Sequence, residues 1–165
     1  MTAALIVIAV LLSLAADLAV MRWLIRYLRD GAVNALREIV GRENVYHVED
    51  CQFFGQLSSG YAQVRGNGLL ALTDQGIHFL MILPRRHLFI PLVSVQGVSR
   101  APSFLGKRSA KGLLRVDFAG EGGCEDACAF LVRSPDWWAS ALLSLISGEE
   151  PPPAPCRIGN RTECG

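Results

Sequence analysis

The sequence predicts a mostly-β α+β domain of seven short antiparallel strands closed by a C-terminal helix and preceded by a long N-terminal helix. Residues 66–92 contain three apolar runs separated by turn residues, which is typical of a β-meander. Residues 134–146 begin with Ser-Pro-Asp and continue with apolar residues at helical spacing, which predicts an amphipathic helix. Residues 3–21 are apolar apart from Ser13 and Asp17, which predicts a membrane-spanning helix.

The length of 165 residues allows one globular domain with accessory segments. The net charge is only +1, but residues 66–118 are basic and residues 119–150 are acidic. This polarity favours an anionic partner for the middle of the chain. An anionic membrane is favoured over nucleic acid, because no nucleic-acid recognition motif accompanies the basic residues.

The N-terminal helix is expected to anchor the chain in a membrane. As a helix, residues 3–21 extend for about 28 Å, which matches the thickness of a bilayer core. Aromatic and basic residues flank the end of this run: Arg22, Trp23, Arg26, Tyr27 and Arg29. By the positive-inside rule, the protein is expected to be a single-pass protein of the plasma (inner) membrane with its C-terminal domain in the cytoplasm. Residues 1–43 form the anchor and a juxtamembrane helix.

A cleaved signal peptide is the alternative for the same segment, because Ser13-Leu14-Ala15 offers small residues at suitable offsets. The chain has no Lys or Arg before the apolar run, which favours a retained anchor. Under the alternative, the remainder would be an exported domain with disulfides.

Residues 44–147 form the predicted β domain. Asn44–Tyr61 is less regular, with a short strand starting at Val45, and it is expected to be a lead-in that packs on the domain. The seven strands are expected at residues 61–65, 69–73, 77–83, 88–92, 95–100, 113–118 and 127–132.

Turn residues separate the first of these strands. Gly66-Asn67-Gly68 predicts a tight hairpin, and Asp74-Gln75-Gly76 predicts a second turn. The C-terminal helix is expected from Pro135 to about Ile146, and residues 148–165 are expected to form a flexible Pro-rich tail.

Several motifs resemble the pleckstrin-homology (PH)-like domains of the GRAM and bacterial PH-like type. Gly68-Leu69-Leu70-Ala71-Leu72-Thr73 followed by Gly76-Ile77-His78-Phe79 is similar to their Gly-x-Leu-x-Leu-Thr turn and the next strand. Ile90-Pro91-Leu92 is similar to their Ile-Pro-Leu bend, and the strands at 114–118 and 130–132 and the Trp137-Trp138 helix follow in the same order. The resemblance covers residues 61–147 and implies a seven-stranded antiparallel barrel or sandwich capped by a C-terminal helix.

The resemblance also implies a function. Such domains are non-enzymatic modules that bind lipid headgroups, peptides or proteins, so a scaffolding role with a protein partner or anionic lipid headgroups is expected. Basic residues on the first hairpin are reduced to Arg65, and others lie on two further connections. The candidate binding residues are Arg65, Arg85, Arg86, Lys107, Arg108 and Lys111. Solvated loop charges with no ligand are the alternative interpretation.

The motifs give no support to an enzyme or a cofactor. Gly66-x-Gly68-x-x-Ala71 fits the loose dinucleotide fingerprint, but that fingerprint requires a helix after the glycines. The histidines at 47, 78 and 87 are scattered, and His78 is expected to point outward from its strand.

The five cysteines leave two alternatives open. An odd number on the cytoplasmic side is expected to remain reduced, with Cys128 as a buried small side chain. A small zinc or redox protein is the weak alternative, with Cys124, Cys128, Cys156 and Cys164 as the ligands.

Overall fold

The computed structural model describes residues 2–60 and 63–155, without the side chains of residues 2–9 and 121. The two α-helices are α1 (Thr2–Val40) and α2 (Pro135–Ile146). The strands are β1 (Val45–Gln56), β2 (Gly66–Thr73), β3 (Gly76–Met81), β4 (Arg86–Pro91), β5 (Val95–Phe104), β6 (Lys107–Ala119) and β7 (Glu125–Leu131), and short 3-10 turns η1, η2 and η3 start at Leu57, Leu92 and Glu121.

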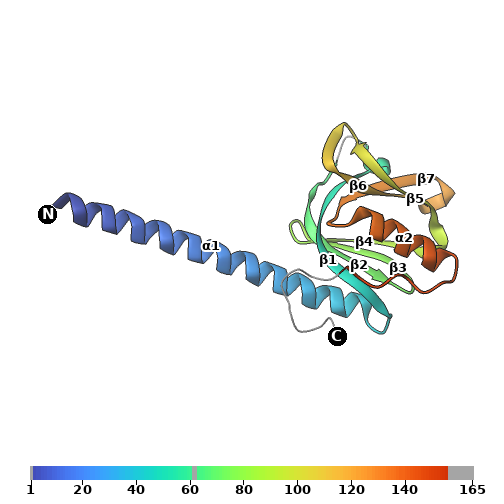
Figure 1. Ribbon diagram of the computed structural model, residues 1–165, viewed down its shortest axis with the longest axis horizontal. Helices are drawn as coiled ribbons and strands as arrows, with labels where there is room; N and C mark the ends of the chain where they lie inside the picture. Colours follow the sequence, from blue (N-terminus) through green and yellow to red (C-terminus); the bar gives the residue numbers. More distant parts are fainter. Residues whose placement is uncertain (1, 61–62, 156–165) are drawn as a thin grey trace.

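The strands form one antiparallel sheet in the order β4-β3-β2-β1-β7-β6-β5. β1 joins the two halves, because it pairs with β2 along residues 45–53 and with β7 along residues 52–56. The sheet curls on itself, and α2 lies across its open side (Figure 1). The predicted mostly-β α+β fold with seven antiparallel strands and a C-terminal helix is confirmed.

The main core lies inside this curled sheet. Phe53, Phe79 and Phe130 contribute rings whose centroids lie 5.1 to 5.4 Å apart. α2 closes the core with Trp138, Ala141 and Leu142, which are fully buried. The bounds of α2 agree with the prediction, because Pro135 at the first helical position and Asp136 in the first turn favour a helix start there.

α1 consists of two halves with different surroundings (Figure 1). Its C-terminal part packs on the outer face of the sheet, where Ala32, Leu36 and Val40 cover Leu69, Ala71 and Leu80. Its N-terminal part projects away from the domain as a single rod. Within the residues that the structure describes, no helix is long and apolar enough to qualify as a membrane span.

The position predicted for the first strand is wrong. β1 lies at Val45–Gln56, within the segment expected to be a lead-in, while Gln63–Arg65 have no regular structure and residues 61–62 lie outside the described chain. Inward-facing residues of β1 include the polar Glu49 beside Cys51 and Phe53, and Glu49 is 8% exposed. Because β1 buries polar side chains, its sequence lacks the regular alternation of apolar and polar residues that identifies a strand.

Two further details differ from the prediction. Gly66 and Gly68 form no hairpin turn but lie in β2, opposite Phe53 and Cys51 of β1. A Cβ atom at Gly68 would clash with the Phe79 ring and the Leu80 carbonyl, so glycine is needed there for close packing. Lys107, Arg108 and Lys111 belong to β6 instead of a loop, because the β5–β6 hairpin turns at Leu105-Gly106.

Candidate functional site

Three connections lie next to one another at one end of the curled sheet, and one of them, the β3–β4 turn, contacts α1. Arg65, in the β1–β2 connection, donates from Nε to the Phe54 carbonyl (2.7 Å) and from Nη2 to the Leu105 carbonyl (3.5 Å), which joins it to the tip of the β5–β6 hairpin. The Leu83 carbonyl lies 3.2 Å from the position of a Cβ at Gly66. The β3–β4 turn is therefore adjacent to the same connection.

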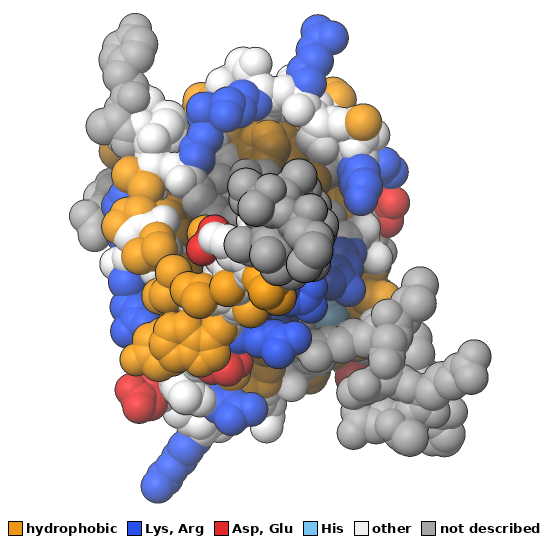
Figure 2. Space-filling view, turned by 90° about the vertical axis from the view of Figure 1, so that its left-hand side faces the viewer, with side chains coloured by type: hydrophobic (Ala, Val, Ile, Leu, Met, Phe, Trp, Pro, Cys, Tyr) orange, Lys and Arg blue, Asp and Glu red, His pale blue; other side chains and the backbone are white. Residues whose placement is uncertain are grey.

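The β3–β4 turn also touches the long helix. Arg85 Nη2 lies 3.5 Å from the position that a Cβ would take at Gly31 of α1. Five basic residues lie on or next to these three connections and are here called the basic rim: Arg65, Arg85, Arg86, Lys107 and Arg108. Figure 2 views the molecule from the side of the α1 N-terminus and shows Lys and Arg side chains distributed around the helix on this face.

Most side chains of the basic rim carry unbalanced charge. Within the described residues, Arg85, Arg86, Lys107 and Arg108 form no ion pair, and all four are exposed. Arg100 and Arg115, in contrast, pair with Asp136 and Asp117. The sequence identified these residues singly. The fold joins Arg65 to the tip of the hairpin that carries Lys107 and Arg108, and it places the turn that carries Arg85 and Arg86 beside the same connection.

Lys111, the sixth predicted binding residue, lies outside the basic rim. Its carbonyl accepts a hydrogen bond from Arg100 Nη2 (2.9 Å), and Arg100 in turn pairs with Asp136 at the start of α2. Lys111 therefore lies on the side of the hairpin that is joined to α2. Substitutions of Lys111 can serve as controls for substitutions in the basic rim.

The residues predicted to flank a membrane lie along α1. Arg22, Trp23, Arg26 and Tyr27 are exposed, and the rings of Trp23 and Tyr27 stack with centroids 5.6 Å apart. Arg29 differs, because it forms two hydrogen bonds with Asp50 of β1, at 2.9 and 2.8 Å. These bonds and the carboxylate charge raise the pKa of Arg29. Arg29 thus fastens α1 to the domain.

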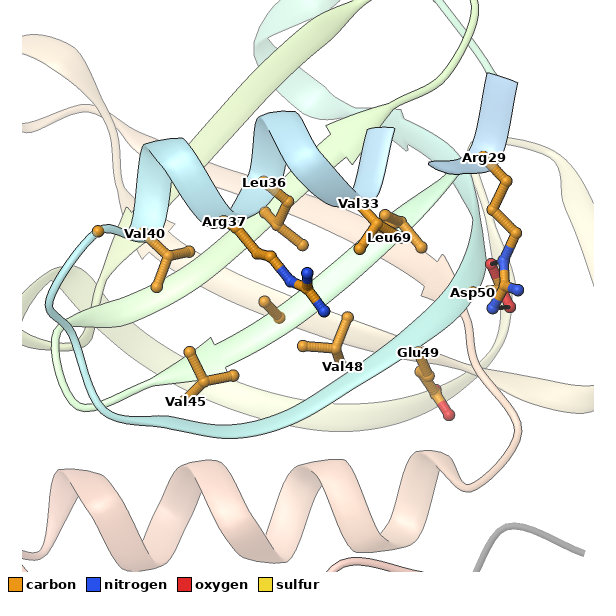
Figure 3. Close-up of a pocket in the computed structure, with 12 residues that line it drawn as sticks. Arg29, Val33, Leu36, Arg37, Val40, Val45, Val48, Glu49, Asp50 and Leu69 are labelled. Carbon is orange, nitrogen blue, oxygen red and sulfur yellow. Dashed lines mark hydrogen bonds and ion pairs between the residues drawn. The ribbon is translucent and has the colours of Figure 1, made fainter. Parts of the chain in front are cut away.

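A groove of about 670 Å³ runs between α1 and the outer face of β1 and β2 (Figure 3). Arg37 extends from α1 across it toward β1, and the Arg29–Asp50 pair closes one end. The remaining lining is mostly aliphatic: Val33, Leu36, Val40, Val45, Val48, Leu69 and Ala71. No local sequence pattern indicates this groove, because it arises from the packing of α1 on distant strands.

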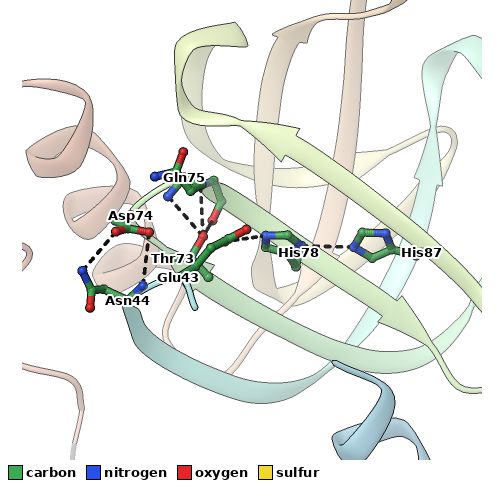
Figure 4. A network of polar contacts seen from close by, with 8 residues as sticks. Glu43, Asn44, Thr73, Asp74, Gln75, His78 and His87 are labelled. Atoms are coloured by element: carbon green, nitrogen blue, oxygen red, sulfur yellow. Dashed lines mark hydrogen bonds and ion pairs between the residues drawn. The ribbon is translucent and has the colours of Figure 1, made fainter. Parts of the chain in front are cut away.

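A chain of polar contacts joins the segment that follows α1 to β3 and β4 (Figure 4). His78 Nε2 lies 2.9 Å from Glu43 Oε2, and His78 Nδ1 lies 3.1 Å from His87 Nε2. The carboxylate accepts, so His78 carries its proton on Nε2 and His87 donates to Nδ1. The prediction that His78 points outward is wrong: it is 3% exposed, stacked on Phe89 and covered by the residues that follow α1.

Burial and the neighbouring His78 together lower the pKa of His87, although Glu43 opposes this effect. The neutral form of His87 is therefore favoured in the folded protein. The network ties the segment after α1 to β3 and β4, and Asp74 strengthens the same junction by accepting from Asn44 at 3.2 and 3.1 Å. The arrangement links the exposed His87, through the buried His78, to the Glu43 carboxylate, which is 23% exposed.

The cysteines are dispersed. Cys51 and Cys128 lie in the main core, where burial raises the pKa of both thiols, whereas Cys124 is exposed. In the described parts of the chain these three are free, and no group of three or more His, Cys, Asp or Glu side chains is arranged to hold a metal. Cys156 and Cys164, the other proposed zinc ligands, lie outside the described residues.

No protein-family model and no curated protein matches this chain. A crystal structure of the C-terminal domain of an unknown protein from Leishmania infantum has a similar fold, with a TM-score of 0.50 and 16% sequence identity. The similarity covers 72% of this chain and 97% of that one. At this identity the likeness concerns the fold alone.

Proposed function

We propose that the protein is a single-pass, membrane-anchored and non-enzymatic binding module whose PH/GRAM-like domain binds anionic lipid headgroups through the basic rim. The observation that carries the proposal is the exposed apolar surface of the projecting half of α1. The exposed side chains there are Val10, Leu11, Leu12, Leu14, Leu18, Val20, Met21, Trp23, Leu24, Ile25 and Tyr27.

A helix that is apolar on all sides is stable in an apolar environment. The described part of α1 does not by itself qualify as a span, so the proposal also uses the sequence, in which the apolar run begins at Ala3. The run of residues 3–21 would cross a bilayer core, with Arg22, Trp23, Arg26 and Tyr27 at headgroup level. Arginines after the run support a cytoplasmic position of the β domain at the inner membrane.

The position of the basic rim supports headgroup binding. Arg85 contacts α1 at Gly31, ten residues after Met21, which corresponds to about 15 Å of helix. Tilting of a membrane helix is common and would bring the rim against the headgroups. Each Lys or Arg near an anionic surface contributes about 1 kcal/mol of attraction. The seven-stranded meander closed by α2 supports the PH/GRAM-like type, because the resemblance of the sequence implies this layout.

Fractionation of cells that express the full chain tests the anchor. We expect the protein to remain with membranes after an alkaline carbonate wash. The double variant Leu11→Arg/Leu14→Arg should be released, because each arginine near the centre of a span costs about 2.5–3.5 kcal/mol. Val93→Arg, at a 97% exposed position of the β domain, is the matched control and should stay in the membrane fraction. Recovery of the uncleaved natural chain in the soluble fraction would overturn the anchor.

A protein partner is the second candidate. It is favoured by a cleft of about 630 Å³ between β4, the end of β6 and the start of β7. The cleft combines Phe89 and Phe118 with the charged Arg86, Glu125 and Asp126. Such a mixture of aromatic and charged groups is suited to a protein surface. Substitution of Phe89 by Ala adds no charge beside Arg86 of the basic rim, so it should abolish capture of such a partner and leave vesicle binding by the rim unchanged.

A further inference from the structure

The groove between α1 and β1 has the size and lining of a ligand site. Its volume of about 670 Å³ lies within the range of roughly 300–1,000 Å³ that is typical of such sites. Seven aliphatic side chains line it, and Val45 is still 48% exposed. Leu36, Val40, Leu69 and Ala71 are already buried, so an apolar occupant would remove from water the exposed surface of Val33, Val45 and Val48.

Arg37 supplies the one free positive charge in the described lining. Figure 3 shows its guanidinium extending from α1 into the groove, between Val45 and Val48 of β1. Within the described residues, no acidic side chain pairs with Arg37. The other arginine of the lining, Arg29, is neutralised by its two hydrogen bonds to Asp50. The groove therefore offers one cation between Val45 and Val48 and a neutral pair at one end. The only other charged residue in the described lining, Glu49, accepts a hydrogen bond from Trp138 of α2.

We propose that this groove binds a single-chain anionic amphiphile, a long-chain fatty acid. Its carboxylate lies on the guanidinium of Arg37, and its hydrocarbon chain lies along the half-buried Val33 and Val48 toward the Arg29–Asp50 pair. A guanidinium and a carboxylate form two parallel hydrogen bonds, so one arginine suffices for one headgroup. A hydrocarbon chain has no polar groups to satisfy, whereas a peptide would press its amides against aliphatic side chains.

This inference is independent of the anchor and of headgroup binding by the basic rim, because the groove contains no residue of the rim. Two probes separate the contribution of the carboxylate from that of the hydrocarbon chain. They are photoactivatable palmitic acid and photoactivatable hexadecanol, which have the same number of carbon atoms. The full chain is reconstituted in phosphatidylcholine nanodiscs, or kept in buffer if it does not enter a bilayer. Cross-linked peptides are then quantified by mass spectrometry.

We expect palmitic acid to label residues 29–50 and 69–71 about tenfold more than hexadecanol does, as expected for one charge-assisted pair. Arg37→Ala should reduce palmitic acid labelling to the hexadecanol level, and Arg37→Lys should retain part of it. Arg42→Ala is the matched control, because Arg42 is exposed one turn away but does not line the groove. Val45→Trp should block both probes by filling the groove.

Five results would overturn the proposal. Equal labelling by the two probes, or equal labelling of the natural chain and Arg37→Ala, would remove the role of the charge. Labelling confined to residues before Arg29 would indicate a probe dissolved in the bilayer. Displacement of the probe by photoactivatable phosphatidylcholine would assign the groove to a phospholipid. Cross-links between two copies through residues 29–50 would assign it to a second chain. Circular dichroism of each variant establishes that it is folded.

Discussion

The indole Nε1 of Trp138 donates a hydrogen bond of 2.8 Å to Oε1 of Glu49, and both side chains are buried. The bond joins α2 to β1 across 89 positions of sequence. The same oxygen accepts from the Arg133 backbone (3.3 Å), and His47 Nε2 lies 3.6 Å from Oε2. This carboxylate therefore anchors the C-terminal helix to the strand that joins both halves of the sheet.

Trp138→Phe is expected to destabilise the fold by about 1–3 kcal/mol, because it leaves a buried carboxylate without its main donor. Urea unfolding of the full chain measures this change. Trp137→Phe is the matched control: its Nε1 donates at the surface to the Pro153 carbonyl (2.9 Å). An equal loss in the two variants would mean that the bond to Glu49 contributes little beyond an ordinary surface hydrogen bond.

Asp126 of β7 closes the opposite end of β1. It accepts from Gln56 Nε2 (2.6 Å), the Ser58 amide (3.0 Å) and the Ala127 amide (2.8 Å). Burial alone would raise the pKa of Asp126, but these hydrogen bonds outweigh it and the pKa is lowered from 3.8. Because the folded pKa is depressed, the resulting stability is present above the unfolded value and is lost as the pH falls through the folded one.

Asp126→Asn is expected to lower the free energy of unfolding by about 1–3 kcal/mol at neutral pH. It should also reduce the loss of stability on acidification below about pH 4. Asp136→Asn, which removes only the exposed pair with Arg100, should cost less than about 1 kcal/mol. Unfolding curves at several pH values measure both variants. Equal losses of unfolding free energy with the same pH dependence would contradict the prediction.

The Glu43–His78–His87 network predicts a second, milder pH dependence. The folded pKa of His87 is lowered from 6.5, so the unfolded chain binds more protons between the two values. The free energy of unfolding should therefore decrease as the pH falls from about 7.5 toward 5.5. His87→Gln should flatten this slope, as measured by urea unfolding at both pH values. A slope unchanged by His87→Gln would show that other groups cause it.

Local signals determined which elements the sequence could predict. Ser134, Pro135 and Asp136 are adjacent and mark the start of α2 by themselves, and the structure places α2 at the predicted bounds. The apolar run of residues 3–21 and the juxtamembrane helix expected after it likewise predicted a long helix, and α1 continues to Val40. Both predictions needed only residues within a few turns of each other.

Long-range contacts explain the errors. Glu49 and His78 look like solvent-facing residues until Trp138 and Glu43 are placed beside them, 89 and 35 positions away. Gly68 looks like a turn residue until the Phe79 ring is packed against it. The groove and the basic rim depend on which strand α1 covers, and no local pattern contains that information. Individual basic residues could be predicted from the sequence, but their grouping could not.

The basic rim predicts a salt-dependent attraction to anionic membranes that can be measured apart from the anchor. A fragment that starts at residue 28 is suitable, because it retains Ala32, Leu36 and Val40 of α1. A shorter fragment from residue 44 would uncover Leu69, Ala71 and Leu80. Charge reversal at Arg85, Arg86, Lys107 and Arg108 should weaken sedimentation with phosphatidylserine-containing vesicles at low salt, by up to about 1 kcal/mol for each charge that nears the surface.

Lys111→Glu in the same fragment is the matched control, because Lys111 lies on the α2 side of the hairpin. It should change vesicle binding much less than Lys107→Glu does, although both remove one lysine of β6. Binding of the natural fragment should decline as salt is raised, because screening shortens the reach of exposed charges to about 8–10 Å. Equal effects of Lys111→Glu and Lys107→Glu would mean that total charge, and not the position of the rim beside α1, governs the attraction.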